Sequence, residues 1–188
     1  MTDSQPGPNT GAIDDLESVL RSTATLLAGV TPDMGPRTTP CTEFDVEHLV
    51  DHVLTWSHDY AVRVAPTPPP PSPPATSGEA GHRAEALDAH ADAIVAGYRA
   101  GTPGALQLPV EILLMDYLGH GWDLAMSTGQ PTAFPESASV RALAAAQQML
   151  TPEMRGDSFG PAVAVPDDAA TLDRLVAFLG RDPGWSAS

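Results

Sequence analysis

Apolar residues recur three or four positions apart along most of the chain, a spacing typical of amphipathic α-helices. No internal repeat accompanies this pattern. The sequence therefore predicts an all-α protein. The expected helices span residues 13–28, 46–64, 79–100, 109–128, 136–150 and 169–179.

Local signals mark several helix ends. Thr42 or Asp45 is placed to cap the second helix, because both side chains can accept a hydrogen bond from a free backbone N–H. Asp167 or Asp168 is placed in the same way before the last helix. Residues 101–109, between the third and fourth helices, are expected to form a turn or a brief extended segment.

Two further connections are distinctive. Residues 65–78 include seven prolines between positions 66 and 74, which excludes a helix interior and predicts a solvated polyproline II loop. A docking site for a proline-binding module is the alternative. Residues 158–168 are expected to form a short strand or an extended strap.

This order of elements suggests a helical bundle with a long Pro-rich connection after its second helix and a short C-terminal helical extension. We therefore expect a disordered tail over residues 1–11, the bundle over residues 12–150, and a strap with a short helix over residues 151–188.

Charge and composition narrow the range of partners. The formal net charge is −15 and all nine basic residues are arginines, so neither nucleic acid nor an anionic membrane is an expected partner. No apolar run approaches the ~20 residues that span a bilayer, and the N-terminus lacks the pattern of a signal peptide. The single cysteine, Cys41, excludes an internal disulfide. These observations favour a soluble cytoplasmic protein.

Three polar groups interrupt the predicted fourth helix, which is otherwise apolar nearly all round. Asp116, His120 and Asp123 follow one another at intervals of four and three residues, which places them on one face. Burying an unpaired carboxylate is costly, so Asp116 needs a cation, a histidine proton or a metal ion as its partner. An Asp and a His four apart can bind one ion, as two histidines do in helical zinc motifs. The plain alternative is a bond between the two side chains.

The predicted second helix carries three histidines. His52 lies at the edge of the apolar stripe, whereas His48 and His58 lie on the polar side. His52 is therefore the one best placed to reach the bundle interior. The alternative is that all three are surface residues of an ordinary amphipathic helix.

If His52 meets Asp116 and His120, two imidazoles and one carboxylate form a three-ligand set that leaves room for water or substrate, as in catalytic zinc sites. Nickel or iron would accept the same set. Asp123 is then placed to accept an imidazole N–H or to act as a fourth ligand.

Other candidates carry weaker signals. His90 borders the apolar stripe of the third helix and is a reserve ligand, while His82 is expected to be solvated. Cys41 precedes a helix start, where the helix dipole lowers a thiol pKa, but no catalytic partner for it is evident. The chain contains no GxGxxG, P-loop, GxSxG or CxxC motif.

Two stretches together resemble the DinB-like metal-binding superfamily. They are TPCTEFDVEHLVDHV at residues 39–53 and DYLGHGWDLAMSTGQ at residues 116–130. More narrowly, they are similar to the branch named after the metal-binding domain of mycothiol-dependent maleylpyruvate isomerase. Residues 159–185 resemble a subfamily of small proteins in that branch.

The resemblance implies an up-and-down four-helix bundle with a divalent metal ion at one end. Carried over residue by residue, the ligands would be His52, Asp116 and His120. The isomerase has glutamate where this chain has Asp116, and Phe44 stands where the branch often has tryptophan. The isomerase also has a C-terminal domain that the residues after Gly129 are too few to form, so maleylpyruvate isomerisation itself is not expected.

The leading hypothesis is a metal-binding protein that acts as a mycothiol-dependent transferase or isomerase. Zinc, or else nickel or iron, would stabilise the thiolate of a small thiol such as mycothiol, which would attack an electrophilic substrate. The alternatives are a hydrolase that uses a metal-bound water and a non-catalytic metal- or ligand-binding stress-response module. DinB-like bundles often dimerise, so a homodimer is a further expectation.

Overall fold

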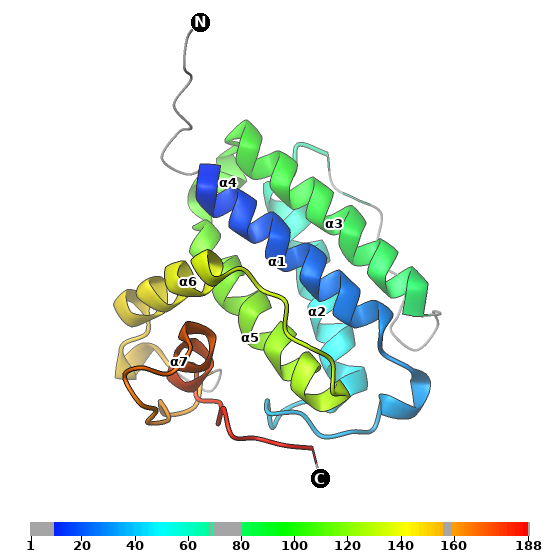
Figure 1. Ribbon diagram of the computed structural model, residues 1–188. Coiled ribbons are helices and arrows are strands. Elements are labelled where there is room, and N and C mark those ends of the chain that lie inside the picture. Colours follow the sequence, from blue (N-terminus) through cyan, green and yellow to red (C-terminus); the bar gives the residue numbers. More distant parts are fainter. Residues whose placement is uncertain (1–9, 68, 70–79, 156–158, 188) are drawn as a thin grey trace, which may run out of the picture.

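The computed structural model describes residues 10–67, 69, 80–155 and 159–187. Apart from one isolated bridge between Thr38 and Asp45, every regular element in these ranges is helical, which confirms the predicted all-α class (Figure 1). The α-helices are α1 (Thr10–Ala28), α2 (Val46–Val64), α3 (Ala80–Ala100), α4 (Pro103–Gln107), α5 (Val110–Thr128), α6 (Glu136–Met149) and α7 (Thr171–Phe178), and short 3-10 turns lie at Pro32–Met34 and Pro152–Met154.

Four long helices surround one hydrophobic core. α1 packs against α3 and α5, and α2 packs against the same two helices (Figure 1). The predicted apolar stripes face this core, and their burial is the main favourable term in folding, at about 2 kcal/mol for each large aliphatic side chain. Completely buried members are Leu16, Val19, Leu20 and Leu27 of α1, Leu49, Val50, Ala61 and Val64 of α2, Leu87, Ala91 and Ile94 of α3, and Leu113, Leu114, Leu118 and Leu124 of α5.

α2 and α3 approach each other closely beside Gly97. A Cβ atom at Gly97 would lie 2.2 Å from the backbone oxygen of Val64, a separation that no side chain can adopt. The absence of a side chain at this position therefore sets how closely the end of α2 packs against α3.

α4 corrects the prediction of a turn or extended segment over residues 101–109. Pro103 occupies its first turn, and the Thr102 side chain accepts a hydrogen bond from the backbone N–H of Ala105 over 3.2 Å. These are ordinary helix-start signals. The helix has only five residues, so no apolar period could develop to reveal it.

The start of α7 also differs from the prediction. Its N-cap is Ala170, and no side chain caps it. Asp167 and Asp168 lie instead in a turn that the backbone N–H of Ala169 closes by donating to Pro166. The prediction that one of these aspartates caps the last helix is therefore wrong. At α2, by contrast, Asp45 is the N-cap and accepts from the backbone N–H of His48.

The segment before α7 is an extended strap, and the alternative of a short strand is not seen in its described residues, 159–168. The backbone N–H of Val163 donates to Ala177 over 2.9 Å, and Arg155 donates to the carbonyl oxygens of Gly160 and Phe178. α7 in turn packs against α6 and α5. The C-terminal region is thus attached to the side of α5 that carries the polar row.

The predicted tail and loop fall largely outside the described residues. α1 begins at Thr10, so residues 10 and 11 belong to this helix and not to the tail expected over residues 1–11. Most of the Pro-rich loop predicted over residues 65–78 is likewise not described.

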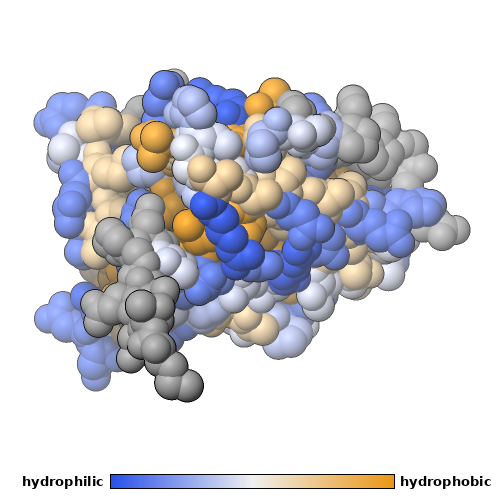
Figure 2. All heavy atoms as spheres, turned by 90° about the horizontal axis from the view of Figure 1, so that it is seen from above, coloured by the Kyte–Doolittle hydropathy of each residue, from blue (hydrophilic) through white to orange (hydrophobic). Residues whose placement is uncertain are grey.

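Seen from above, apolar residues gather near the middle of the visible face, with polar residues around them (Figure 2). None of the helices in the described ranges has the length and apolar character needed to cross a membrane.

Candidate metal centre

α2 and α5 bring His52, Asp116 and His120 together. Each residue contributes one potential ligand atom, and the three atoms lie within 4.8 Å of one another. His120 Nε2 is 3.6 Å from Asp116 Oδ1, and the ring centroids of His52 and His120 are 4.8 Å apart. The three residues of the predicted ligand set therefore converge from two helices.

This donor set fits a divalent metal ion. A tetrahedral ion with bonds of about 2.0–2.1 Å holds its ligand atoms roughly 3.3 Å apart. The three ligand atoms lie within 4.8 Å of one another, so the group would contract by up to about 1.5 Å to reach that spacing. Two neutral imidazoles and one carboxylate also leave a coordination position open, as in catalytic zinc sites.

Electrostatics keep His52 in the form that binds metals. Burial lowers the pKa of His52, and the neighbouring His120 lowers this pKa further, while the carboxylate of Asp116 opposes both effects. The neutral imidazole is the form with a lone pair available for a metal ion.

The second ring nitrogen of His120 faces Asp123. His120 Nδ1 lies 3.2 Å from Asp123 Oδ2, and the Asp123 side chain is completely buried. A neutral His120 that donates from Nδ1 presents the lone pair of Nε2 toward Asp116. Asp123 thus occupies the position expected for an acceptor that orients a ligating imidazole.

Arg181, from the segment after α7, supplies the charge that buried Asp123 needs. Its Nη2 donates to Asp123 Oδ2 over 3.0 Å, its Nε lies 3.4 Å from Oδ1, and its Nη1 donates to the carbonyl oxygen of Leu179 over 3.1 Å. Sequence analysis did not single out Arg181. A sequence signal for such a partner did exist. Asp123 lies on an apolar helix, so its carboxylate needs a cation when it is buried, and only nine basic residues could supply one.

The triad and Arg181 line a cavity of about 260 Å³ whose wall is more apolar than polar. Phe44 packs against His52 with 4.7 Å between ring centroids, and Trp56, which is 40% exposed, lies at the cavity rim. Tyr60 donates a hydrogen bond to Asp116, and burial together with this carboxylate raises the pKa of Tyr60 well above its usual value. Apolar walls around a few polar groups are typical of small-molecule sites.

Cys41 lines the same cavity and forms a second group of potential ligands with His120 and Asp123. Burial and the charge of Asp123 raise the pKa of the Cys41 thiol, although Arg181 opposes them. The prediction of a lowered thiol pKa is therefore wrong.

The other histidines lie away from the triad, and none of them belongs to a group of three potential ligands in the described part of the chain. His90 is 1% exposed and its Nδ1 lies 2.7 Å from Ser57 Oγ, so the structure does not place it as a reserve ligand. The prediction that His58 lies on the outward polar side is wrong, because His58 is half-buried against His90. His48 and His82 are exposed, as predicted.

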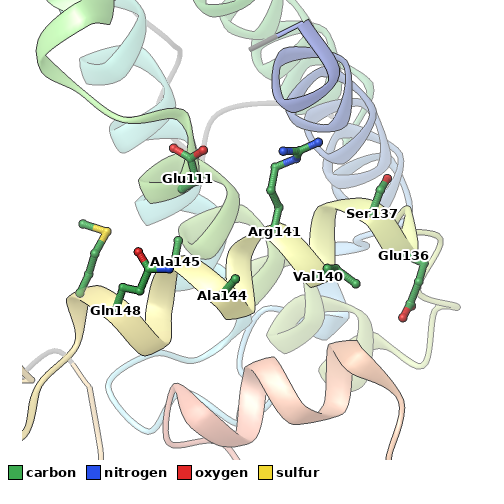
Figure 3. Close-up of a pocket in the computed structure, with 9 residues that line it drawn as sticks. Glu111, Glu136, Ser137, Val140, Arg141, Ala144, Ala145 and Gln148 are labelled. Atoms are coloured by element: carbon green, nitrogen blue, oxygen red, sulfur yellow. The ribbon is translucent and has the colours of Figure 1, made fainter. Parts of the chain in front are cut away.

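A larger cavity of about 660 Å³ lies along α6, with Glu111 of α5 at its edge (Figure 3). Arg141 extends from α6 toward α1, where its Nε lies 2.9 Å from Asp15 Oδ2. The described residues that line this cavity form no group of three potential metal ligands. The chemistry is therefore concentrated in the smaller cavity.

Comparison with known proteins identifies two relatives. The chain is 34% identical over 169 residues to the uncharacterised protein MT0763 of Mycobacterium tuberculosis strain CDC 1551 / Oshkosh and to the uncharacterised protein Rv0738 of strain ATCC 25618 / H37Rv. Each alignment covers 84% of this chain and 91% of the relative. No family model matches the chain, and no solved structure matches it.

Proposed function

This chain belongs to the same family as these two uncharacterised mycobacterial proteins, and on that premise we propose that it is a divalent metal-binding protein. His52, Asp116 and His120 would hold the ion. We further propose that α1, α2, α3 and α5 form a bundle of the DinB-like type. The packing of α1 and α2 between α3 and α5 supports this assignment.

One observation carries the proposal. Two imidazoles and a carboxylate from α2 and α5 converge within 4.8 Å inside a cavity. Behind them, the buried Asp123–Arg181 pair holds the other nitrogen of His120. Buried ionic groups are costly to maintain, and an orienting acceptor behind a histidine is a common feature of protein metal sites.

For the activity, we propose a transferase or isomerase that depends on a small thiol such as mycothiol. A divalent ion at the triad would supply Lewis-acid activation by lowering the pKa of a bound thiol. Tyr60 restrains Asp116 through its hydrogen bond, and the Phe44 and Trp56 rings lie beside the His52 ring. The apolar cavity wall suits an electrophile with an apolar body.

A metal-dependent hydrolase is the second candidate, and Glu43 favours it. This carboxylate lines the cavity together with the triad, where it could accept a proton from an attacking water molecule. Activity that persists without thiol would support the hydrolase, and activity that requires thiol would support the transferase or isomerase. Metal binding without turnover of thiol or ester probes would indicate a non-catalytic binding module.

The ligand assignment is tested by His52→Ala and His120→Ala. Each variant is expected to lose at least 90% of the metal that the purified wild-type protein retains, because two remaining donors hold a divalent ion weakly. Elemental analysis measures the metal content, and circular dichroism checks the fold. His48→Ala is the matched control, since His48 is an exposed histidine of the same helix. Full metal content in both ligand variants would disprove the assignment.

A further inference from the structure

We propose a second cation site, formed by Cys41, His120 and Asp123, that takes a soft divalent ion such as Zn²⁺ or Cd²⁺. The potential ligand atoms of these residues lie within 4.8 Å of one another. This inference goes beyond the proposed function, because the site lies on the other side of the His120 ring from the triad and requires no turnover.

The two nitrogens of His120 serve different groups. Nε2 is 3.6 Å from Asp116 Oδ1, whereas Nδ1 is 3.2 Å from Asp123 Oδ2. An imidazole can coordinate through either nitrogen. A ring that holds one ion at Nε2 could hold another at Nδ1 as a bridging imidazolate, which forms when the second ion displaces the Nδ1 proton to solvent and leaves the ring with a charge of −1.

The donor set determines which ions are suitable. A thiolate sulfur selects soft or borderline ions, while imidazole and carboxylate are also ordinary zinc ligands. As the metal–sulfur bond forms, the Cys41 thiol proton leaves to solvent, so the sulfur binds as a thiolate. Cys41 is half-buried at the cavity wall, so an ion can enter from the cavity without unfolding the chain.

Arg181 is the obvious competitor for Asp123. Its guanidinium donates to both oxygens, to Oδ2 over 3.0 Å and to Oδ1 over a longer 3.4 Å, so an ion would use the second lone pair of Oδ1. With the Cys41 thiolate, Asp123, Arg181 and a divalent ion, this group would carry a net charge of about +1. The triad with Asp116 and its own ion would also carry about +1. The His120 imidazolate shared by the two ions would lower the sum for both sites to about +1, so Arg181 does not exclude the second site.

Cadmium titration of metal-free protein tests the proposal. Wild type is expected to bind a second equivalent of Cd²⁺, with an ultraviolet charge-transfer band from thiolate to cadmium. The near-isosteric variant Cys41→Ser is expected to lose the band and this equivalent while it retains the triad ion. In zinc-loaded wild type, X-ray absorption should show a sulfur neighbour at about 2.3 Å.

The variant His52→Ala separates this proposal from the proposed function. It is expected to lose the triad ion and to keep the thiolate band. A wild type that binds one equivalent with no sulfur neighbour would overturn the second site and leave the triad assignment intact. A band that disappears in both His52→Ala and Cys41→Ser would make Cys41 a ligand of the triad ion, which also overturns a separate site.

A measurement on the wild-type chain alone covers the case in which Cys41→Ser does not fold. Bound Cd²⁺ is expected to slow alkylation of Cys41 by iodoacetamide at least tenfold, because a coordinated sulfur is blocked from attack. Mg²⁺ at the same concentration serves as the control, since it binds thiolates poorly. Equal alkylation rates with Cd²⁺ and with Mg²⁺ would overturn the proposal.

Discussion

At the scale of single residues, His120 is the side chain on which the candidate site depends. Its Nε2 faces Asp116 and its Nδ1 faces Asp123. Asp123 is in turn neutralised by Arg181. A substitution of Arg181 is therefore expected to affect the triad through the Arg181–Asp123 and Asp123–His120 contacts, although Arg181 itself is not a proposed ligand.

Arg181→Ala is expected to lower both stability and metal affinity. Removing the guanidinium leaves Asp123 buried and unpaired, so the free energy of unfolding should fall by about 3–5 kcal/mol. Metal affinity should fall about 10- to 100-fold because His120 loses its fixed orientation. Urea unfolding and a metal-competition titration measure the two effects.

Arg37→Ala is the matched control for this prediction. Arg37 forms an exposed ion pair with Asp33, so its loss should change the free energy of unfolding by no more than about 1 kcal/mol. If the Arg181 variant were no less stable than this control, the ion pair would not support the site.

The residues of the site divide sharply by how far they could be predicted. Asp116, His120 and Asp123 were identifiable because a helical period is local and places positions four and three apart on one face. His52 was identifiable from its position at the edge of an apolar stripe. Cys41 and Arg181 lie outside the helices, and only tertiary packing decides where such segments lie, so no local period could place them at the cavity.

At the scale of the elements, helix length decided which predictions succeeded. α2 and α5 each have 19 residues, long enough for the apolar period to repeat several times, and both were predicted almost to their ends. α4, with five residues, has fewer than two turns and was missed. At α7, an Asp–Asp pair that resembled a cap belongs to a turn, because the sequence signals of caps and turns overlap.

Gly97→Ala is expected to destabilise the contact between α2 and α3. The new methyl group would lie 2.2 Å from the backbone oxygen of Val64, so the helices must move apart at a cost of about 1–3 kcal/mol. Gly81→Ala, in the same helix, meets no atom within 4 Å and should be neutral or stabilising by up to about 1 kcal/mol. Urea unfolding compares the two, and equal effects would contradict a role for Gly97 in close packing.

At the scale of the whole molecule, a buried histidine makes the fold sensitive to acid. His90, between α2 and α3, is 1% exposed and lies against Ser57 and His58. Burial, and then the nearby His58, lower the pKa of His90 from 6.5 to about 4. In the unfolded chain this histidine takes up its proton near pH 6.5.

The global free energy of unfolding should therefore fall as the pH drops from about 6.5 to about 4. In this window His90 is protonated in the unfolded chain but remains neutral in the folded protein. The free energy of unfolding therefore falls by about 3 kcal/mol in total. Above pH 6.5 His90 is neutral in both the folded and the unfolded chain, so its burial does not lower the free energy of unfolding there. His90→Gln should flatten the pH dependence by this amount, whereas His82→Gln, at an exposed position, should not. Equal pH profiles for all three proteins, measured by urea unfolding, would contradict the prediction.

The contact between Asp123 and Arg181 has a consequence for the order of events during folding. The two residues are 58 positions apart, and His52 lies far from both in the chain. Such long loops close late, after local helices have formed. Because a chain is synthesised from its N-terminus, Arg181 is made after all three proposed ligands. A nascent chain can thus carry all three proposed ligands before it carries their support, so ion capture by a centre that Arg181 supports must follow the synthesis of that arginine.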